Sequence, residues 1–162
     1  MKPELPSEIK QHLLDSIQNL KAIKLCLENE KLALQTRDLD QIESLAKQKE
    51  HCLEQIKGDI KARNSLISSM GFSIDEAGME SLIASLPEQH ANALNKGWQQ
   101  LVNLHNDIQQ LNQANGMVIN RGLQQVDMML GIVQSGSNAR TTKTYNAKGR
   151  SVATTSRIIG QA

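Results

Sequence analysis

Apolar side chains recur at three- and four-residue steps along most of the chain, which is the pattern of amphipathic helices. In a first predicted helix over 7–35, leucines recur at every seventh position, a spacing typical of a coiled-coil seam; they are Leu13, Leu20, Leu27 and Leu34. A second helix is predicted over 38–70. It starts at Asp38, which together with Gln41 resembles a capping box, and ends before Gly71. We therefore predict two long helices joined by a tight turn.

The two helices are predicted to pair as an antiparallel hairpin, in which facing residues have numbers with a constant sum. A sum of 73 matches many apolar positions; the pairs are Leu34 with Leu39, Leu27 with Ala46, Leu20 with Leu53, Ile17 with Ile56 and Leu13 with Ile60. The same register places Lys24 opposite Lys49. Because like charges repel, these two lysines should splay outward or lie at a helix edge.

A short amphipathic helix is predicted over 75–86 and a third long helix over 88–133. The short helix carries its apolar residues on one side; they are Met79, Leu82, Ile83 and Leu86. The third helix has a seam of alternating four- and three-residue steps; it comprises Leu94, Trp98, Leu101, His105, Ile108, Asn112, Asn115, Ile119, Gly122, Val126, Met129 and Val133. At ~1.5 Å per residue this helix is on the order of 65 Å long, which is long enough to overhang the bundle.

The end of the third predicted helix is apolar around more than one face. The residues concerned are Met117, Val118, Ile119, Leu123, Val126, Met129, Leu130 and Val133. A helix that is apolar on several faces must be buried on several faces, and a three-helix bundle supplies only one. A second copy of the chain or a client protein would cover the surplus, and methionine suits a surface that adapts to its partner. Alternatively, the short helix over 75–86 covers it.

Charge separates the chain into a body and a tail. Residues 1–134 hold 13 basic and 17 acidic residues, whereas residues 135–162 hold 5 basic and no acidic residue. The tail is rich in Ser and Thr and shows no periodicity, so we predict that it is disordered in the isolated protein. Its single aromatic residue, Tyr145, is a candidate anchor for a partner, although the tail could equally be a solvated end. Five basic residues and one ring are too few to predict nucleic-acid binding.

Composition and motifs favour a binding protein over an enzyme. Aromatic residues make up only 2% of the chain, which suits packed helices better than a sheet. No catalytic constellation, His-x-x-x-His pair or Cys-x-x-Cys motif is present, so we predict no catalytic residue, no metal and no cofactor. His105 is predicted to be a partly buried core histidine, and Cys26 and Cys52 to be small buried hydrophobes. The first residues lack the apolar core of a signal peptide and no apolar run spans a membrane, which predicts a cytoplasmic protein.

Several motifs resemble the FlgN family. Asn112-Gln113-Ala114-Asn115-Gly116-Met117-Val118-Ile119 resembles its Asn-x-x-Asn-Gly-x-x-Ile signature, and Thr142 to Arg150 resembles its Thr-x-Thr-Tyr-x-x-x-Gly-Arg tail. Further similar features are Glu28 with Ala33-Leu34, Asp38-Leu39-Asp40, the segment Lys47 to Leu53, and Trp98 at the opening of the last helix. Together the resemblance covers nearly the whole chain.

The resemblance implies a function that the residues alone do not. FlgN-like proteins are cytoplasmic chaperones of the flagellar type III export system, which bind C-terminal segments of the hook–filament junction proteins FlgK and FlgL and hand them to the export gate. This implies client binding on the late third helix and the tail. The residues themselves leave another interpretation open, namely a structural or regulatory coiled-coil adaptor that dimerises or binds another protein through its third helix.

Overall fold

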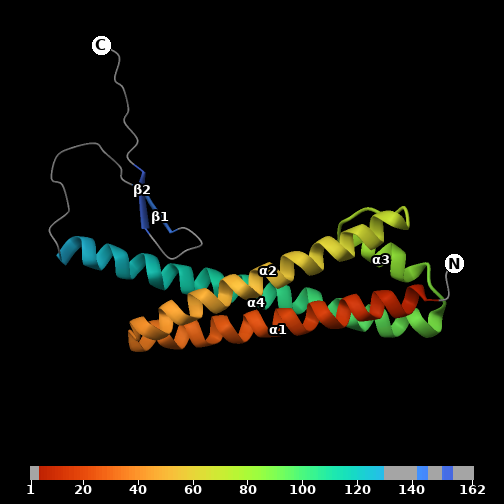
Figure 1. The fold of residues 1–162 in the computed structure, drawn as a ribbon, viewed down its shortest axis with the longest axis horizontal. Helices are drawn as coiled ribbons and strands as arrows, with labels where there is room; N and C mark the ends of the chain where they lie inside the picture. The colour runs from red at the N-terminus through yellow and green to blue at the C-terminus, as the bar shows by residue number, and fades with distance from the viewer. Residues whose placement is uncertain (1–3, 130–141, 146–150, 155–162) are drawn as a thin grey trace, which may run out of the picture.

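A computed structural model describes residues 4–129, 142–145 and 151–154 of the 162-residue chain; of residues 126–129 and both strands it describes only the backbone path. Within these ranges the elements are α1 (Leu5–Thr36), α2 (Leu39–Ser69), α3 (Glu76–Ala84), α4 (Glu88–Met129), β1 (Thr142–Tyr145) and β2 (Ser151–Thr154). The helices confirm the predicted all-α bundle of three long helices and a short connector helix (Figure 1). Residues 130–133 of the third predicted helix lie outside the described residues.

Local signals explain where the long helices begin and end. Pro6 lies in the first turn of α1, where its missing N–H needs no partner. Arg37 ends α1 with a left-handed backbone (φ 54°), and the Asp38 N–H then donates to the Ala33 carbonyl over 3.0 Å. Asp38 in turn caps α2, because its Oδ1 accepts a hydrogen bond of 3.1 Å from the Gln41 N–H. The turn between α1 and α2 is therefore only two residues long, as Arg37 and Asp38 separate Thr36 from Leu39.

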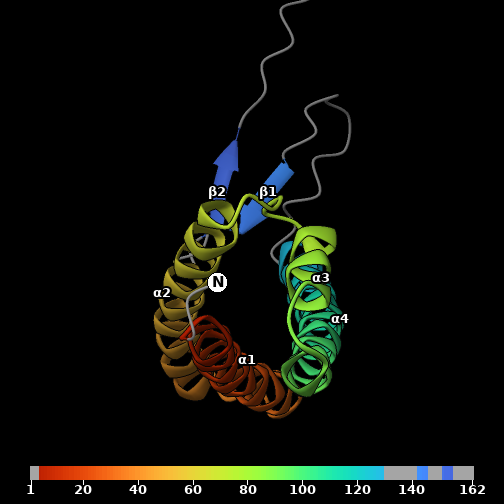
Figure 2. The same cartoon turned by 90° about the vertical axis from the view of Figure 1, so that its right-hand side faces the viewer.

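Helix α1 is the central element, with α2 and α4 packed on two different sides of it (Figure 2). Helix α2 runs antiparallel to α1. Helix α4 runs parallel to α1, because polar contacts between them join residues 83 and 85 positions apart, in Lys24 with Asp107 and Glu30 with Asn115. Because α2 and α4 cover α1 on two sides, the buried residues of α1 occupy much of its circumference.

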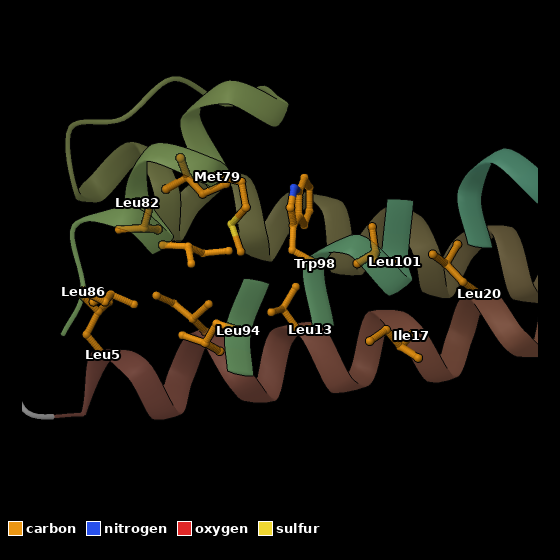
Figure 3. Packing of buried hydrophobic residues seen from close by; sticks show 13 residues of the cluster. Leu5, Leu13, Ile17, Leu20, Met79, Leu82, Leu86, Leu94, Trp98 and Leu101 are labelled. Atoms are coloured by element: carbon orange, nitrogen blue, oxygen red, sulfur yellow. The ribbon is translucent and has the colours of Figure 1, made fainter. Parts of the chain in front are cut away.

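The main core fills the end of the bundle where α3 lies (Figure 3). The four apolar residues predicted for the short helix are all buried; Met79, Leu82 and Ile83 belong to α3, and Leu86 follows two residues after its end. They pack in one cluster with Leu5, Leu94 and Trp98, which lie near the beginnings of α1 and α4. Helix α3 therefore covers the first part of α4. The alternative in which the short helix covers the apolar end of the third helix is wrong.

The predicted register between α1 and α2 is also wrong. Leu53 and Ile60, which a sum of 73 places in the interface, are more than 40% exposed. Polar contacts between the two helices join other positions, namely Asn19 with Asp59 at 2.7 Å, Glu30 with Lys49 at 3.4 Å, and Cys26 with the Leu45 carbonyl at 3.4 Å. None of these pairs adds up to 73. Helix α2 contacts α1 along one narrow stripe and has few buried apolar residues, so its apolar pattern alone does not fix the register.

The seam of α4 deviates from the predicted one at three positions. Trp98, Leu101 and Asn115 are buried as predicted. His105, Asn112 and Gly122 are exposed instead, and the partly buried neighbours Leu104 and Leu111 replace the first two. Beyond Leu101, α4 rests mainly on α1 alone, so only a narrow stripe is covered. A leucine gains more from that cover than a neighbouring polar side chain.

The tail contains a short hairpin that the sequence analysis did not predict. Strands β1 and β2 pair antiparallel, with Thr142 opposite Thr154 and Tyr145 opposite Ser151. The other tail residues (135–141, 146–150 and 155–162) lie outside the described residues. Because a two-stranded hairpin is at best marginally stable on its own in water, mobility of the tail in solution stays a prediction.

A close backbone contact at the start of α3 gives a test of the packing. Asp75 accepts a hydrogen bond of 2.8 Å from the Gly78 N–H, and a Cβ at Gly78 would overlap the Ser73 carbonyl. We expect Gly78→Ala to lower the free energy of unfolding by about 1–3 kcal/mol through this clash. Gly58→Ala is the matched control. No heavy atom lies within 4 Å of its new methyl group, so the change should stabilise α2 by roughly 0.5–1 kcal/mol. Urea unfolding of both variants measures the two changes in the free energy of unfolding. Changes of the same sign in the two variants would contradict the prediction.

Candidate functional site

The last part of α4, residues 117–129, is here called the terminal segment. The offset of 85 residues between α1 and α4 places the end of α1 beside residue 121. Most of the terminal segment therefore extends past the turn that joins α1 and α2, and Figure 1 shows this end of α4 projecting beyond the hairpin. The third long helix therefore overhangs the hairpin, as its predicted length allowed.

The terminal segment presents apolar side chains with incomplete cover. Met117 is 50% exposed and Val118 is 46% exposed, while Ile119 and Leu123 are partly buried. Val126 and Met129 lie on the same helix, although their side chains are outside the described set, and Leu130 and Val133 lie outside the described residues altogether. Exposed apolar residues gathered at one end of a helix are typical of an interaction surface.

Two residues before Met117, a buried polar cluster ties α4 to the hairpin. Asn115 is 1% exposed, and its Nδ2 donates to the Leu27 carbonyl (2.9 Å) and to Glu30 Oε1 (3.0 Å). Glu30 is 5% exposed and also accepts from Lys49 Nζ of α2 at 3.4 Å. We call Asn115, Glu30 and Lys49 the polar tie. It joins α1, α2 and α4 in one layer, so it fixes the point beyond which α4 continues with less support.

Two further contacts position α4 along its length. The Lys24 ammonium donates to Asp107 Oδ2 at 3.0 Å, and this hydrogen bond raises the pKa of Lys24. The Arg63 guanidinium of α2 lies 5.5 Å from the centre of the Trp98 ring, and burial lowers the pKa of Arg63. Lys24 and Lys49 each have their own carboxylate partner, Asp107 of α4 for Lys24 and Glu30 of α1 for Lys49.

Cys26 belongs to a second, smaller apolar cluster with Ala33 and Leu45. Its thiol donates to the Leu45 carbonyl over 3.4 Å, and burial raises its pKa. Because thiolate is the reactive form, Cys26 should react with a thiol reagent only when the protein unfolds, whereas the partly buried Cys52 should react first. Titration with Ellman's reagent at pH 8, with and without urea, measures this. Equal rates in the absence of urea would contradict the described burial.

Neither a metal site nor a membrane span is found in the described part of the chain. Residues 4–129, 142–145 and 151–154 contain no group of three or more His, Cys, Asp or Glu side chains that could hold a metal ion. No helix among the described residues has the length and hydropathy needed to cross a bilayer.

Sequence reasoning missed part of this arrangement. It placed Asn115 on the seam but not Glu30 or Lys49, because a glutamate and a lysine within a long helix resemble solvated surface residues. One signal was available: a polar residue at a seam position of a coiled coil usually has a polar partner on the facing helix.

The model of the FlgN protein family matches residues 1–153. The chain belongs to the FlgN family. The match includes all four helices and both Asn115 and the β1 strand. The family is one of chaperones for flagellum biogenesis rather than of enzymes, and it is associated with flagellar export and hook-associated proteins.

A solved structure supports the fold of this FlgN-family chain. A Pseudomonas aeruginosa protein assigned to flagella synthesis as FlgN matches with a TM-score of 0.63 and 21% sequence identity. The match covers 71% of this chain and 88% of that one. At this identity the likeness concerns the fold. No curated protein matches the chain at a significant level.

Proposed function

We propose that this FlgN-family chain is a cytoplasmic export chaperone that binds the C-terminal segments of the hook–filament junction proteins FlgK and FlgL and delivers them to the flagellar export gate. The client-binding residues in this proposal are Met117, Val118, Ile119, Leu123, Val126, Met129, Leu130 and Val133. The observation that carries it is the terminal segment of α4, in which Met117 and Val118 are about half exposed and whose helix then continues past the hairpin.

The chemistry of such a client fits this surface. In this proposal the client's terminal segment is an amphipathic helix that would self-associate before export. The terminal segment can pack against one such segment as a coiled coil, because it presents apolar residues along a helix that already projects from its bundle. The client orders on binding, and the entropy that it loses keeps the affinity moderate. Moderate affinity permits release at the gate.

Titration calorimetry of the full chain with the C-terminal segments of FlgK and FlgL tests the proposal. We expect one-to-one binding of both segments and no binding of the same segments with their apolar positions changed to serine. Binding of neither segment, together with co-purification of a transcriptional or assembly regulator from the host, would favour the regulatory adaptor. A stable dimer that binds no client would favour the structural coiled coil instead.

Tyr145 provides a separate prediction for the tail. It lies at the end of β1, opposite Ser151, in a segment whose charge is basic. We expect Tyr145→Ala to weaken binding to either the client segment or the export gate by roughly 2 kcal/mol, because a lone ring in a polar segment is a typical interface anchor. Helicity and melting temperature should stay unchanged, which circular dichroism checks. Tyr145→Phe is the matched control, since it keeps the ring. Normal export and normal gate binding by Tyr145→Ala would show that the tail is a solvated end.

A further inference from the structure

A second candidate surface lies at the opposite end of the bundle from the terminal segment. It is a groove of about 680 Å³ between the first parts of α1 and α4, and we call it the basic groove. On α1, it is formed by residues on the helical face of Lys10, Leu14 and Ile17. This face differs from the one that holds Asn19 and Cys26, which contact α2. The groove is therefore separate from the hairpin interface and from the terminal segment.

The floor of the basic groove is apolar and partly uncovered. Leu13, Ile17 and Leu94 are buried beneath it, while Leu14 is 50% exposed at its edge. Gly97 contributes no side chain to the wall, and even an added Cβ there would meet Leu13 at an ordinary contact distance of 3.5 Å. An exposed leucine beside a recess with an apolar floor gives an amphipathic partner a place to insert a side chain.

The rim of the basic groove is positively charged. Lys10 and Lys96 line it from opposite helices, together with His90, and no Asp or Glu is among the lining residues. Within the described ranges, neither lysine forms an ion pair. Further along α4, a shallower recess continues from Lys96 to Asp107, but that carboxylate is already paired with Lys24. The residues that line the groove thus carry positive charge and no carboxylate.

We infer that the basic groove docks a short, acidic amphipathic helix of a partner protein. Its floor accepts apolar side chains and its lysines pair with carboxylates at the edges of the docked helix. From Pro6 to Ile17 it runs roughly 17 Å, which matches about three turns of helix. The chain's own tail is excluded as the occupant, because residues 135–162 hold 5 basic and no acidic residue and the lysines repel it. This inference does not depend on where the client binds.

Two synthetic helical peptides test the inference directly. One carries leucines on a single face with flanking glutamates, and the other replaces every glutamate by lysine. We expect the acidic peptide to shift the backbone amide resonances of Leu14 and Gly97 in the full chain, and its affinity to fall several-fold when salt is raised. The lysine peptide should not bind. Equal binding of both peptides, or shifts confined to the terminal segment, would overturn the inference.

Charge-reversal variants locate the effect. Lys10→Glu with Lys96→Glu should weaken the acidic peptide at least 10-fold. The matched control, Lys57→Glu with Lys61→Glu, changes charge equally beside another recess on α2 and should leave the affinity unchanged within two-fold. Equal losses in the two double variants would mean non-specific attraction and overturn the proposal. Tighter binding to phosphatidylserine vesicles than to the peptide, abolished by the groove variant, would also overturn it in favour of a lipid surface.

Discussion

Asn115→Asp should lower the free energy of unfolding by about 3 kcal/mol at pH 7. The new carboxylate would lie beside Glu30 Oε1, which is 3.0 Å from the present Nδ2 donor, in a site that is almost fully buried. It would also lose the hydrogen bond to the Leu27 carbonyl. Two adjacent buried carboxylates cannot both ionise cheaply, so one keeps its proton in the folded protein and its pKa rises above the unfolded value.

The pH dependence of this variant has a definite sign. A folded-state pKa above the unfolded one makes the penalty absent at low pH, where both states are protonated, and the penalty grows as pH rises through the unfolded pKa of ~4. Most of the lost stability should therefore return near pH 4. Asn112→Asp is the matched control, because Asn112 is exposed one turn earlier and the change should stay within about 0.5 kcal/mol. If urea unfolding gives the two variants the same stability at both pH values, the polar tie contributes nothing.

Leu123→Asp should weaken the binding of FlgK and FlgL segments by about 100-fold or more. The change removes an apolar contact and introduces a carboxylate that the client would bury without a partner, which together cost on the order of 3 kcal/mol. Val126→Asp should act in the same way. Met117→Asp should do so without affecting the fold, because the Met117 side chain is already 50% exposed. Calorimetric titration of each variant gives the affinities.

The matched control for these variants is Leu53→Asp on α2. Leu53 is 46% exposed, as Val118 is. The substitution therefore adds the same charge at a similarly exposed position away from the terminal segment. It should bind both segments with the affinity of the parent chain. Normal client binding by all three terminal-segment variants, with unchanged melting temperatures, would place the client elsewhere on the molecule.

The sequence predicted the buried residues best in α1, the helix that packs against two neighbours. Leu13, Leu20 and Leu27 were assigned to a seam and are buried, because α1 has neighbours on two sides. The remaining side of α1 still exposes Leu14, Leu25 and Leu32. Helix α2 touches α1 on one side, and several of its apolar residues are simply exposed. Its periodicity therefore predicted a helix but could not select among registers.

The candidate sites depend on the offset between α1 and α4, which periodicity does not encode. The sequence alone showed that the terminal segment is apolar around more than one helical face, because this follows from the spacing of apolar residues within a single helix. The partnership of Asn115 with Glu30, 85 positions apart, requires knowing which turn of α1 meets which turn of α4. The basic groove requires the same knowledge, because Lys10 and Lys96 are unremarkable surface lysines until the two helices lie side by side.

The parallel pairing of α1 with α4 also has a consequence during synthesis on the ribosome. The two-residue turn lets α1 and α2 form a hairpin early, since their contacts are local in sequence. The side of α1 that α4 later covers, including Leu13 and Leu27, then has no partner until α4 has emerged. At 5–20 residues per second, that interval lasts roughly several seconds. During it the nascent hairpin displays a stripe of leucines, so the chain is itself most prone to association before its last helix is made.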